Sequence, residues 1–365
     1  MRKKIIVLLS SLLFLMSSCL GSEILEKAKN ESSNVEIEEI PENYHSKLDA
    51  IWVLGGQDGS SLVTQLEYYE PFYDRWNTAD ILDIPTPVRN AACAAYENKI
   101  YVFGGINGAG TVINSVQVYD VLANTWATDD NLPANRQGHS AVTADGNIFI
   151  LGGSGTALAG GGTQTIYRFR PYNASGSRWS ASLGNWVYTY TRMDSGFAYL
   201  DGEIIYGGGR YTNGAAYTHI STFWPSSNGY QNAVGYLRQA RYAVTAAAYS
   251  TPEKKYVFFA GGSTVTNTAQ FPSAFSPSSR VDIYQPYSEN GIRVVLSGPT
   301  MINARAYAQS AVKGNYFYVM GGSVGTTNAL SSVERLNAKS PFSSSWESRA
   351  TMPRARRGFC AVTLR

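Results

Sequence analysis

The chain has 365 residues, of which 44% are hydrophobic and 16% are charged, so it can bury a large core and carries less charge than an ordinary soluble domain. Its 35 glycines and 25 tyrosines suit short strands joined by tight turns. The formal net charge of +3 falls far short of what a nucleic-acid-binding protein carries, so we expect no nucleic-acid partner.

The first residues are expected to form an export signal. Residues 2–4 are basic and precede an apolar run over 5–16, which is too short to span a bilayer as a helix. The following "LMSSCLGS" resembles a bacterial lipobox, in which Cys19 would be lipidated and become the mature N-terminus. Met16 stands where leucine is usual, so an ordinary secretory signal or a retained anchor are the alternatives. We expect a signal peptide over 1–18 and a lipid-anchored protein of the bacterial cell envelope, in the outer membrane.

A flexible tether is predicted over residues 19–49. Residues 22–49 contain eight acidic and three basic residues, and Tyr44 is the only aromatic residue among them. Such a segment cannot bury enough apolar surface to fold alone. The remaining residues, 50–365, carry a net charge of about +5, which suits an anionic partner.

A short apolar strand ending in two glycines, such as "IYVFGG", recurs six times in residues 50–365. The first glycines of the pairs are Gly55, Gly104, Gly152, Gly208, Gly261 and Gly321. Their spacing of 48 to 60 residues indicates a repeat architecture.

Each repeat carries further common signals. After the glycines comes a strand with an aromatic residue and then, in most copies, a tryptophan, as in Tyr69 with Trp76 and Tyr119 with Trp126. An arginine with small residues follows, as in "ARYAVTAAAY", and the next apolar strand comes after it. Each repeat therefore predicts four short strands. One such sheet has two apolar faces and needs neighbours to bury both.

These repeats resemble the kelch family of β-propellers over the whole of residues 50–365. The resemblance implies an all-β fold, a six-bladed kelch propeller. The first repeat begins at its second strand, "AIWVLGG", whereas the last ends in "RARRGFCAVTL", which has the sequence of an innermost strand. We therefore expect the C-terminal strand to complete the first blade and close the ring. Kelch domains include enzymes, adaptors and structural proteins, so the fold does not settle the function.

An arginine begins the expected innermost strand of every repeat. The six residues are Arg89, Arg136, Arg192, Arg241, Arg305 and Arg356. In kelch domains that capture acidic peptides, arginines at about this position contact the ligand. The resemblance therefore implies a rim of guanidinium groups suited to carboxylate or sulfate. The alternative is that each arginine only hydrogen-bonds backbone carbonyls of an adjacent blade.

Two long segments after Gly-Gly pairs are further candidates for ligand binding. Residues 210–230 and 263–280 are rich in aromatic residues, Asn, Ser and Thr, which can stack on sugar rings or form a polar contact surface. Tyr211, Trp224 and Phe271 are the aromatic candidates in them. The alternative is that these loops have no binding role.

The sequence predicts no catalytic residue, no cofactor and no metal site. The three histidines lack metal-ligand spacing, and no nucleophile elbow, HExxH motif or distinctive carboxylate pair is present. Cys93 and Cys360 each lie four residues after an arginine, so they should occupy equivalent positions in neighbouring blades. Equivalent side chains point the same way round a ring, and we therefore expect no disulfide between them.

Three functions are compatible with the sequence. The favoured one is a monomeric, lipid-anchored binding module that presents the arginine rim and the loops to a protein or glycan partner, with anionic groups suiting the arginines. A second follows from a resemblance to the bacterial sialic-acid mutarotases, which are six-bladed exported kelch proteins that act on a small anionic sugar, although no catalytic acid stands out in this sequence. The third is a purely structural protein of the envelope.

Overall fold

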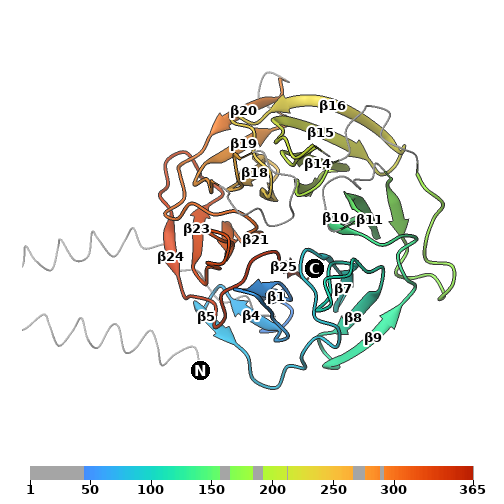
Figure 1. The fold of residues 1–365 in the computed structure, drawn as a ribbon. Helices are drawn as coiled ribbons and strands as arrows, with labels where there is room; N and C mark the ends of the chain where they lie inside the picture. Colours follow the sequence, from blue (N-terminus) through green and yellow to red (C-terminus); the bar gives the residue numbers. More distant parts are fainter. Residues whose placement is uncertain are drawn as a thin grey trace, which may run out of the picture. The chain divides into compact units, whose positions relative to one another are not determined.

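The computed structural model describes residues 45–156, 165–183, 192–211, 213–265, 276–287 and 292–364. In this part of the chain, six sheets of three or four antiparallel strands surround a central axis, and a small hairpin is added (Figure 1). The expected six-bladed propeller is thus confirmed.

The first three blades contain the following strands, in order from the axis outward. Blade 1 contains β25 (Cys360–Thr363), β1 (Ile51–Leu54), β4 (Glu67–Glu70) and β5 (Arg75–Asn77). Blade 2 contains β6 (Ala92–Tyr96), β7 (Lys99–Phe103), β8 (Val116–Asp120) and β9 (Thr125–Asp129). Blade 3 contains β10 (Gln137–Ala144), β11 (Asn147–Ser154) and β12 (Tyr167–Phe169). The hairpin consists of β2 (Gln57–Asp58) and β3 (Ser61–Leu62).

The other three blades each have four strands. Blade 4 contains β13 (Gly196–Leu200), β14 (Glu203–Gly207), β15 (His219–Trp224) and β16 (Gly229–Tyr236). Blade 5 contains β17 (Thr245–Ser250), β18 (Lys255–Ala260), β19 (Val281–Gln285) and β20 (Val294–Ser297). Blade 6 contains β21 (Gln309–Lys313), β22 (Tyr316–Met320), β23 (Val333–Asn337) and β24 (Glu347–Arg349).

The C-terminal strand closes the ring. β25 pairs antiparallel with β1, with Cys360 opposite Leu54 and Thr363 opposite Ile51. The last strand of the chain therefore supplies the innermost strand of the first blade, as the sequence predicts. Two segments at opposite ends of the domain thus form one sheet.

The apolar core lies between the blades. Each of the six boundaries between neighbouring blades holds one cluster of buried hydrophobic side chains. At the first boundary Trp52 of blade 1 packs against Ile100 and Tyr119 of blade 2, and the Trp52 and Tyr119 ring centroids are 5.6 Å apart. Full burial of one such side chain is worth about 1.5–3 kcal/mol, so each blade depends on both neighbours.

The Gly-Gly pairs let the backbones of neighbouring blades touch. Gly104 and Gly105 both have positive φ, +56° and +95°. A Cβ at Gly105 would lie 2.9 Å from the Arg89 carbonyl oxygen, so no other residue fits there without a shift. The Gly105 N–H instead donates to the Arg136 carbonyl of the next blade at 2.8 Å. The glycines thus end the second strand and join two blades.

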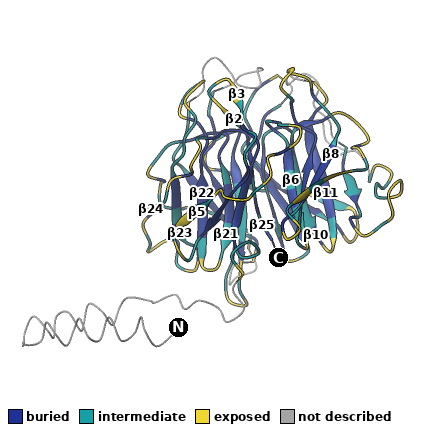
Figure 2. Cartoon of the chain, turned by 90° about the horizontal axis from the view of Figure 1, so that it is seen from below, coloured by how far each residue is buried: buried dark blue, intermediate teal, exposed yellow. Residues whose placement is uncertain are grey.

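The propeller has two different faces (Figure 2). The Gly-Gly face carries the segments after the glycine pairs and the starts of the innermost strands. The hairpin face carries the turns that lead from innermost to second strands, such as Glu97–Asn98. The chain enters at the hairpin face, where the Trp52 indole donates to the Lys47 carbonyl at 2.8 Å and the Lys313 ammonium lies 3.3 Å from Asp49 Oδ1. The compact unit that contains the described residues begins at His45.

Candidate functional site

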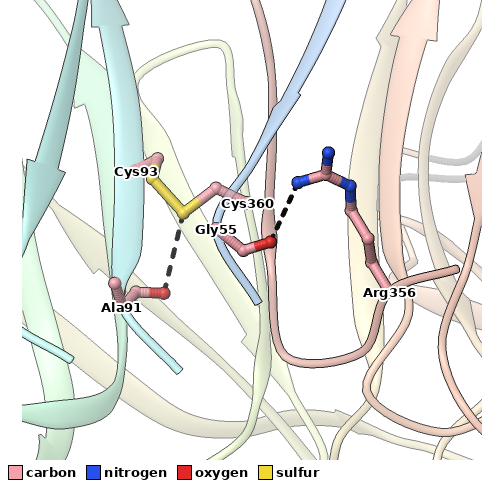
Figure 3. Close-up of a disulfide and its surroundings, with 5 residues drawn as sticks. All are labelled: Gly55, Ala91, Cys93, Arg356 and Cys360. Atoms are coloured by element: carbon pink, nitrogen blue, oxygen red, sulfur yellow. Dashed lines mark hydrogen bonds between the residues drawn. A yellow bond between two sulfur atoms is a disulfide. The ribbon is translucent and has the colours of Figure 1, made fainter. Parts of the chain in front are cut away.

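Five of the six predicted arginines are buried inside their own blades. They are Arg136, Arg192, Arg241, Arg305 and Arg356, each at most 7% exposed. Arg305 and Arg356 each donate from Nη1 to the carbonyl of the first glycine in their own blade, Gly321 at 2.8 Å and Gly55 at 3.0 Å (Figure 3 shows the second bond). Three of the arginines also form ion pairs with buried carboxylates, namely Arg241 with Asp282, Arg305 with Glu334 and Arg356 with Glu67.

The backbone carbonyls of these arginines also connect the blades. The carbonyl of Arg356 accepts from the N–H of Gly322, the second glycine of the preceding blade, at 2.8 Å. Burial lowers the pKa of Arg136 to about 10, since water cannot stabilise the charge there. This geometry favours the structural alternative that the sequence left open, with one difference. The guanidinium groups bond carbonyls of their own blade, and the neighbouring blade is bound through the backbone.

Arg89 does not occupy the position of the other five. In blade 2 the equivalent residue is Val88, because the Val88 carbonyl accepts from the N–H of Gly56 at 2.8 Å in the same way. Arg89 stands one residue further along the strand, at the position that Arg357 occupies before β25. Successive side chains of an extended chain alternate in direction, so Arg89 lies towards the axis and is only half-buried. The expectation of six equivalent arginines was wrong at this residue.

Six main-chain hydrogen bonds form a closed ring around the axis at the Gly-Gly face. Each N–H donates to the carbonyl of the same position in the preceding blade, at 2.7 to 3.2 Å. The members of this axial ring are Asn90, Gly138, Asp194, Ala243, Tyr307 and Gly358. All six have φ between +51° and +58°, a conformation uncommon for Ala243 and Tyr307. The innermost strands are thereby drawn together at this end of the axis.

Polar side chains of the axial ring come from alternate blades. Asp194 of blade 4 forms an ion pair with Arg210, the residue after the glycine pair of that blade, at 2.8 Å, and both side chains are buried. Burial raises the pKa of Asp194, and Arg210 offsets part of this shift. Tyr307 of blade 6 is buried beside this pair, and burial raises its pKa well above the usual value. The Asn90 side-chain amide of blade 2 is buried without a hydrogen-bond partner in the described part of the chain.

Three arginines surround the axial ring, and we call them the axial arginine cluster: Arg89, Arg210 and Arg357. Burial lowers the pKa of Arg357, and the nearby Arg89 guanidinium lowers it further. Burial also lowers the pKa of Arg89. The effect of Arg89 on the Arg357 pKa shows that these two guanidinium groups are close enough for their charges to interact. Sequence reasoning found Arg89 but missed the other two, because only the fold shows that Arg210, after a glycine pair, and Arg357, directly after Arg356, reach the axis.

The predicted aromatic candidates do not come together. Tyr211 lies on the Gly-Gly face and stacks on Tyr217, with ring centroids 3.4 Å apart. Trp224 is the last residue of β15 and therefore lies at the hairpin face, at the opposite end of the strand. The expectation of a single loop over 210–230 was therefore wrong, because part of this segment is strand. Phe271 lies outside the described residues.

A cavity follows the axis below the axial ring. Its upper part has a volume of about 180 Å³ and is lined by the axial ring and the first residues of the innermost strands. A second part of about 420 Å³ adjoins it through shared lining residues such as Ala141 and Ser310, and reaches turn residues such as Glu97 and Gly146. We call these two parts the axial pit. The pit is narrowed by the hydrogen-bonded ring at the Gly-Gly face and extends to the hairpin face.

A disulfide between Cys93 of β6 and Cys360 of β25 lines the axial pit (Figure 3). The Cα atoms are 5.8 Å apart, within the usual range. The expectation of free cysteines was therefore wrong. Cys360 lies opposite Leu54, one residue before the glycine pair, whereas Cys93 lies opposite Val102, two residues before it. The two positions differ by one, so their side chains point in opposite directions round the ring and meet between blades 1 and 2.

Metal centres and membrane-spanning helices are both absent from the described residues. Among them, no group of three or more His, Cys, Asp or Glu side chains is placed to hold a metal ion. Nor does the described part of the chain contain a helix long and apolar enough to cross a membrane.

Comparison with known proteins agrees with this architecture. A family model described as "KLHDC2/KLHL20/DRC7 Kelch-repeats domain" matches residues 45–262, and one described as "Kelch motif" matches residues 304–353. The solved structure of YjhT superposes with a TM-score of 0.65 at 16% identity, covering 84% of this chain and 99% of that one.

Curated relatives match over shorter stretches. Beta-scruin of Limulus polyphemus is 34% identical over 122 residues, which is 32% of this chain and 13% of that protein. The Rab9 effector protein with kelch motifs of Rattus norvegicus is 34% identical over 111 residues, 28% of this chain and 30% of that protein. Kelch-like protein 35 of Mus musculus is 26% identical over 179 residues, 48% of this chain and 28% of that protein. The chain thus spans less than a third of the length of these relatives.

Proposed function

Since this chain belongs to the kelch-repeat family, we propose that it is an exported, lipid-anchored binding module that presents its Gly-Gly face to a protein or glycan partner carrying anionic groups. The observation that carries this proposal is the placement of the axial arginine cluster. The cluster lies on the Gly-Gly face, since Arg89 pairs with Ile106, Arg357 pairs with Gln57 and Arg210 itself follows a glycine pair, whereas the chain enters the domain at the hairpin face. Lys47 and Asp49, which contact the hairpin face, therefore do not cover the cluster.

The electrostatics of the Gly-Gly face support an anionic ligand group. Arg89 is half-buried, so its guanidinium is partly desolvated and still reachable, and Arg357 behind it adds a second positive charge. Arg354, in the segment that enters β25, is exposed on the same face. A carboxylate or sulfate bound beside Arg89 would be attracted by two nearby guanidinium charges, whereas an isolated surface arginine offers one.

Binding is tested by comparing faces of the propeller. The double variant Arg89→Ala/Arg354→Ala removes two positive charges from the Gly-Gly face, and Lys339→Ala removes an exposed charge from a turn at the hairpin face. We expect the full chain to retain a protein from envelope extracts, or a sulfated or sialylated glycan on an array, and the double variant to lose about 90% of this signal. Equal losses in Lys339→Ala would contradict the proposal, because they would indicate non-specific attraction.

Export is supported by the disulfide, since such bonds persist in oxidising compartments and are rare in the cytosol. The predicted lipidation at Cys19 lies outside the described residues and remains part of the proposal. Metabolic labelling with a fatty acid should mark the wild-type chain, and Cys19→Ser should abolish the label. Proteolysis of whole cells then distinguishes a surface-facing propeller, which is digested, from one that faces the periplasm. A wild-type chain without the fatty-acid label would exclude the lipid anchor, but it would not contradict the proposed binding at the Gly-Gly face.

One observation favours an enzyme as a second candidate. The sequence offered no catalytic acid for a mutarotase-type reaction, whereas the structure places Asp194 beside Arg210 at the axis with a raised pKa. An acid whose pKa is raised by burial is a candidate for proton transfer to or from a substrate. NMR measurement of sialic-acid anomer exchange tests this candidate. Wild-type protein should accelerate the exchange and Asp194→Asn should not, and an unchanged rate with wild-type protein excludes it.

A further inference from the structure

The disulfide connects the last strand of the chain to a blade to which that strand does not belong. Cys360 is in β25, which forms the inner edge of blade 1, and Cys93 is in β6 of blade 2. The two cysteines are 267 residues apart in sequence, so the bond encloses most of the propeller in one covalent loop. Only four residues of β25 pair with β1, and the ring is closed through this short strand.

An equivalent contact elsewhere in the ring is not covalent. Thr245 of blade 5 lies opposite Ala260, one residue before its glycine pair, and Ser310 of blade 6 lies opposite Val319, two residues before its pair. These are the positions of Cys360 and Cys93, and the two hydroxyl oxygens are 2.7 Å apart. The hydroxyl contact joins blades 5 and 6, each of which is built from one continuous repeat. The covalent bond occurs where β25, from the last repeat, completes the first blade.

Only small molecules can reach this disulfide in the closed ring. Cys360 is 5% exposed and Cys93 is partly exposed, and both cysteines line the upper part of the axial pit, which extends to the hairpin face. The upper part has a volume of about 180 Å³, room for a small thiol but not for the active-site loop of a folded oxidoreductase. The bond is therefore shielded from protein dithiols for as long as β25 stays in place.

The segment that leads into β25 also supplies the Gly-Gly face. Arg356 forms its buried ion pair with Glu67, and Arg357 is a member of the axial arginine cluster. Both residues precede Cys360 by three or four positions. Displacement of β25 would therefore remove two arginines from their sites as well as open blade 1.

We propose that the Cys93–Cys360 disulfide is a redox-sensitive latch that keeps the ring closed by holding the terminal strand against blade 2. A small dithiol opens the latch by two exchange steps. Its first thiolate attacks one sulfur to form a mixed disulfide and releases the other cysteine. Its second thiolate then displaces the remaining cysteine, so the reagent is oxidised to a cyclic disulfide and Cys93 and Cys360 become thiols.

Hydrogen exchange measured by mass spectrometry on the full chain tests the latch. Dithiothreitol is the reductant, and the double variant Cys93→Ser/Cys360→Thr is the matched control, because it recreates the hydroxyl pair of Thr245 and Ser310. After reduction, amides of β25 and β1 should exchange about tenfold faster, whereas those of β17 and β18 in blade 5 should stay within about twofold. The hydroxyl variant should resemble the reduced protein.

Two outcomes overturn the proposal. One is unchanged exchange in β25 and β1 after complete reduction, which would show that packing alone holds the strand. The other is a uniform increase over all blades, which would show a loss of global stability without a local latch. If the hydroxyl variant does not fold, the reversible reduction of the wild-type chain still gives both readouts. Reduction by thioredoxin should be at least about a hundredfold slower than by dithiothreitol at equal thiol concentration, and equal rates would contradict the shielding.

Discussion

Arg356 and Arg357 are adjacent in sequence but have different surroundings. Arg356 is enclosed in blade 1, where it meets Glu67 and the Gly55 carbonyl. Arg357 lies at the axis, where its nearest charged neighbours include Arg89. Neighbouring side chains of an extended strand point in opposite directions. Arg356 therefore supports the blade, whereas the next residue, Arg357, belongs to the candidate site. Four predictions test this difference, from the largest expected effect to the smallest.

The largest effect is expected at a blade arginine with a buried acid. Arg305→Ala leaves Glu334 buried without its counter-charge, so the free energy of unfolding should fall by about 3–5 kcal/mol. Urea denaturation followed by tryptophan fluorescence measures the loss. Replacing both residues, as in Arg305→Met/Glu334→Gln, should restore part of it, because the glutamine oxygen can still accept from Ile302 or Asn303 without a buried charge. A loss below about 1 kcal/mol would show that the ion pair does not support the blade.

A smaller effect is expected where the blade arginine contacts carbonyls and a ring instead of an acid. Arg136 donates to the carbonyls of Gly152 and Thr165 at 3.0 and 3.1 Å, and its guanidinium lies over the Tyr167 ring. Arg136→Ala should therefore lower the free energy of unfolding by about 1–3 kcal/mol, since it removes two hydrogen bonds to backbone carbonyls and the contact with the ring. The same denaturation assay measures it. A loss as large as that of Arg305→Ala would remove the distinction between the two kinds of arginine.

At the axis the effect should depend on pH. Burial raises the pKa of Asp194 above its usual 3.8, so the folded state binds this proton more tightly than the unfolded state. The contribution of Asp194 to the free energy of unfolding is therefore largest below pH 3.8, and it falls as the pH rises from there through the raised pKa. Each tenfold difference in proton affinity between the folded and unfolded states corresponds to about 1.4 kcal/mol. The difference in unfolding free energy between wild type and Asp194→Asn, measured from pH 3 to 8, should show this slope. A flat difference would contradict the raised pKa.

The smallest effect on stability is expected in the axial arginine cluster itself. Arg89 is half-buried, and its removal relieves repulsion with Arg357. Arg89→Ala should change the free energy of unfolding by less than about 1 kcal/mol while weakening ligand retention. Thermal melting and the binding assay are measured on the same preparation. A large loss of stability would show that Arg89 supports its blade, as the five buried arginines do.

Much of the fold follows from local sequence signals. The six glycine pairs mark the ends of the second strands, and the incomplete first and last repeats predict that β25 joins β1. These signals are readable because every blade repeats the same local requirement, a positive φ where two backbones meet. The candidate site was less predictable, because a shift of one residue at Arg89 leaves the motif recognisable while it moves the side chain to another environment.

The sequence by itself determined the number of blades, the closing strand and the presence of an arginine at almost every innermost strand. Only the tertiary structure decided which arginines are enclosed, that Arg210 and Arg357 join Arg89, and that Cys93 meets Cys360. The physical reason is that strand periodicity fixes position along a blade to within a residue, whereas direction round the axis alternates with every residue. The closing contacts depend on that direction and join segments 267 residues apart.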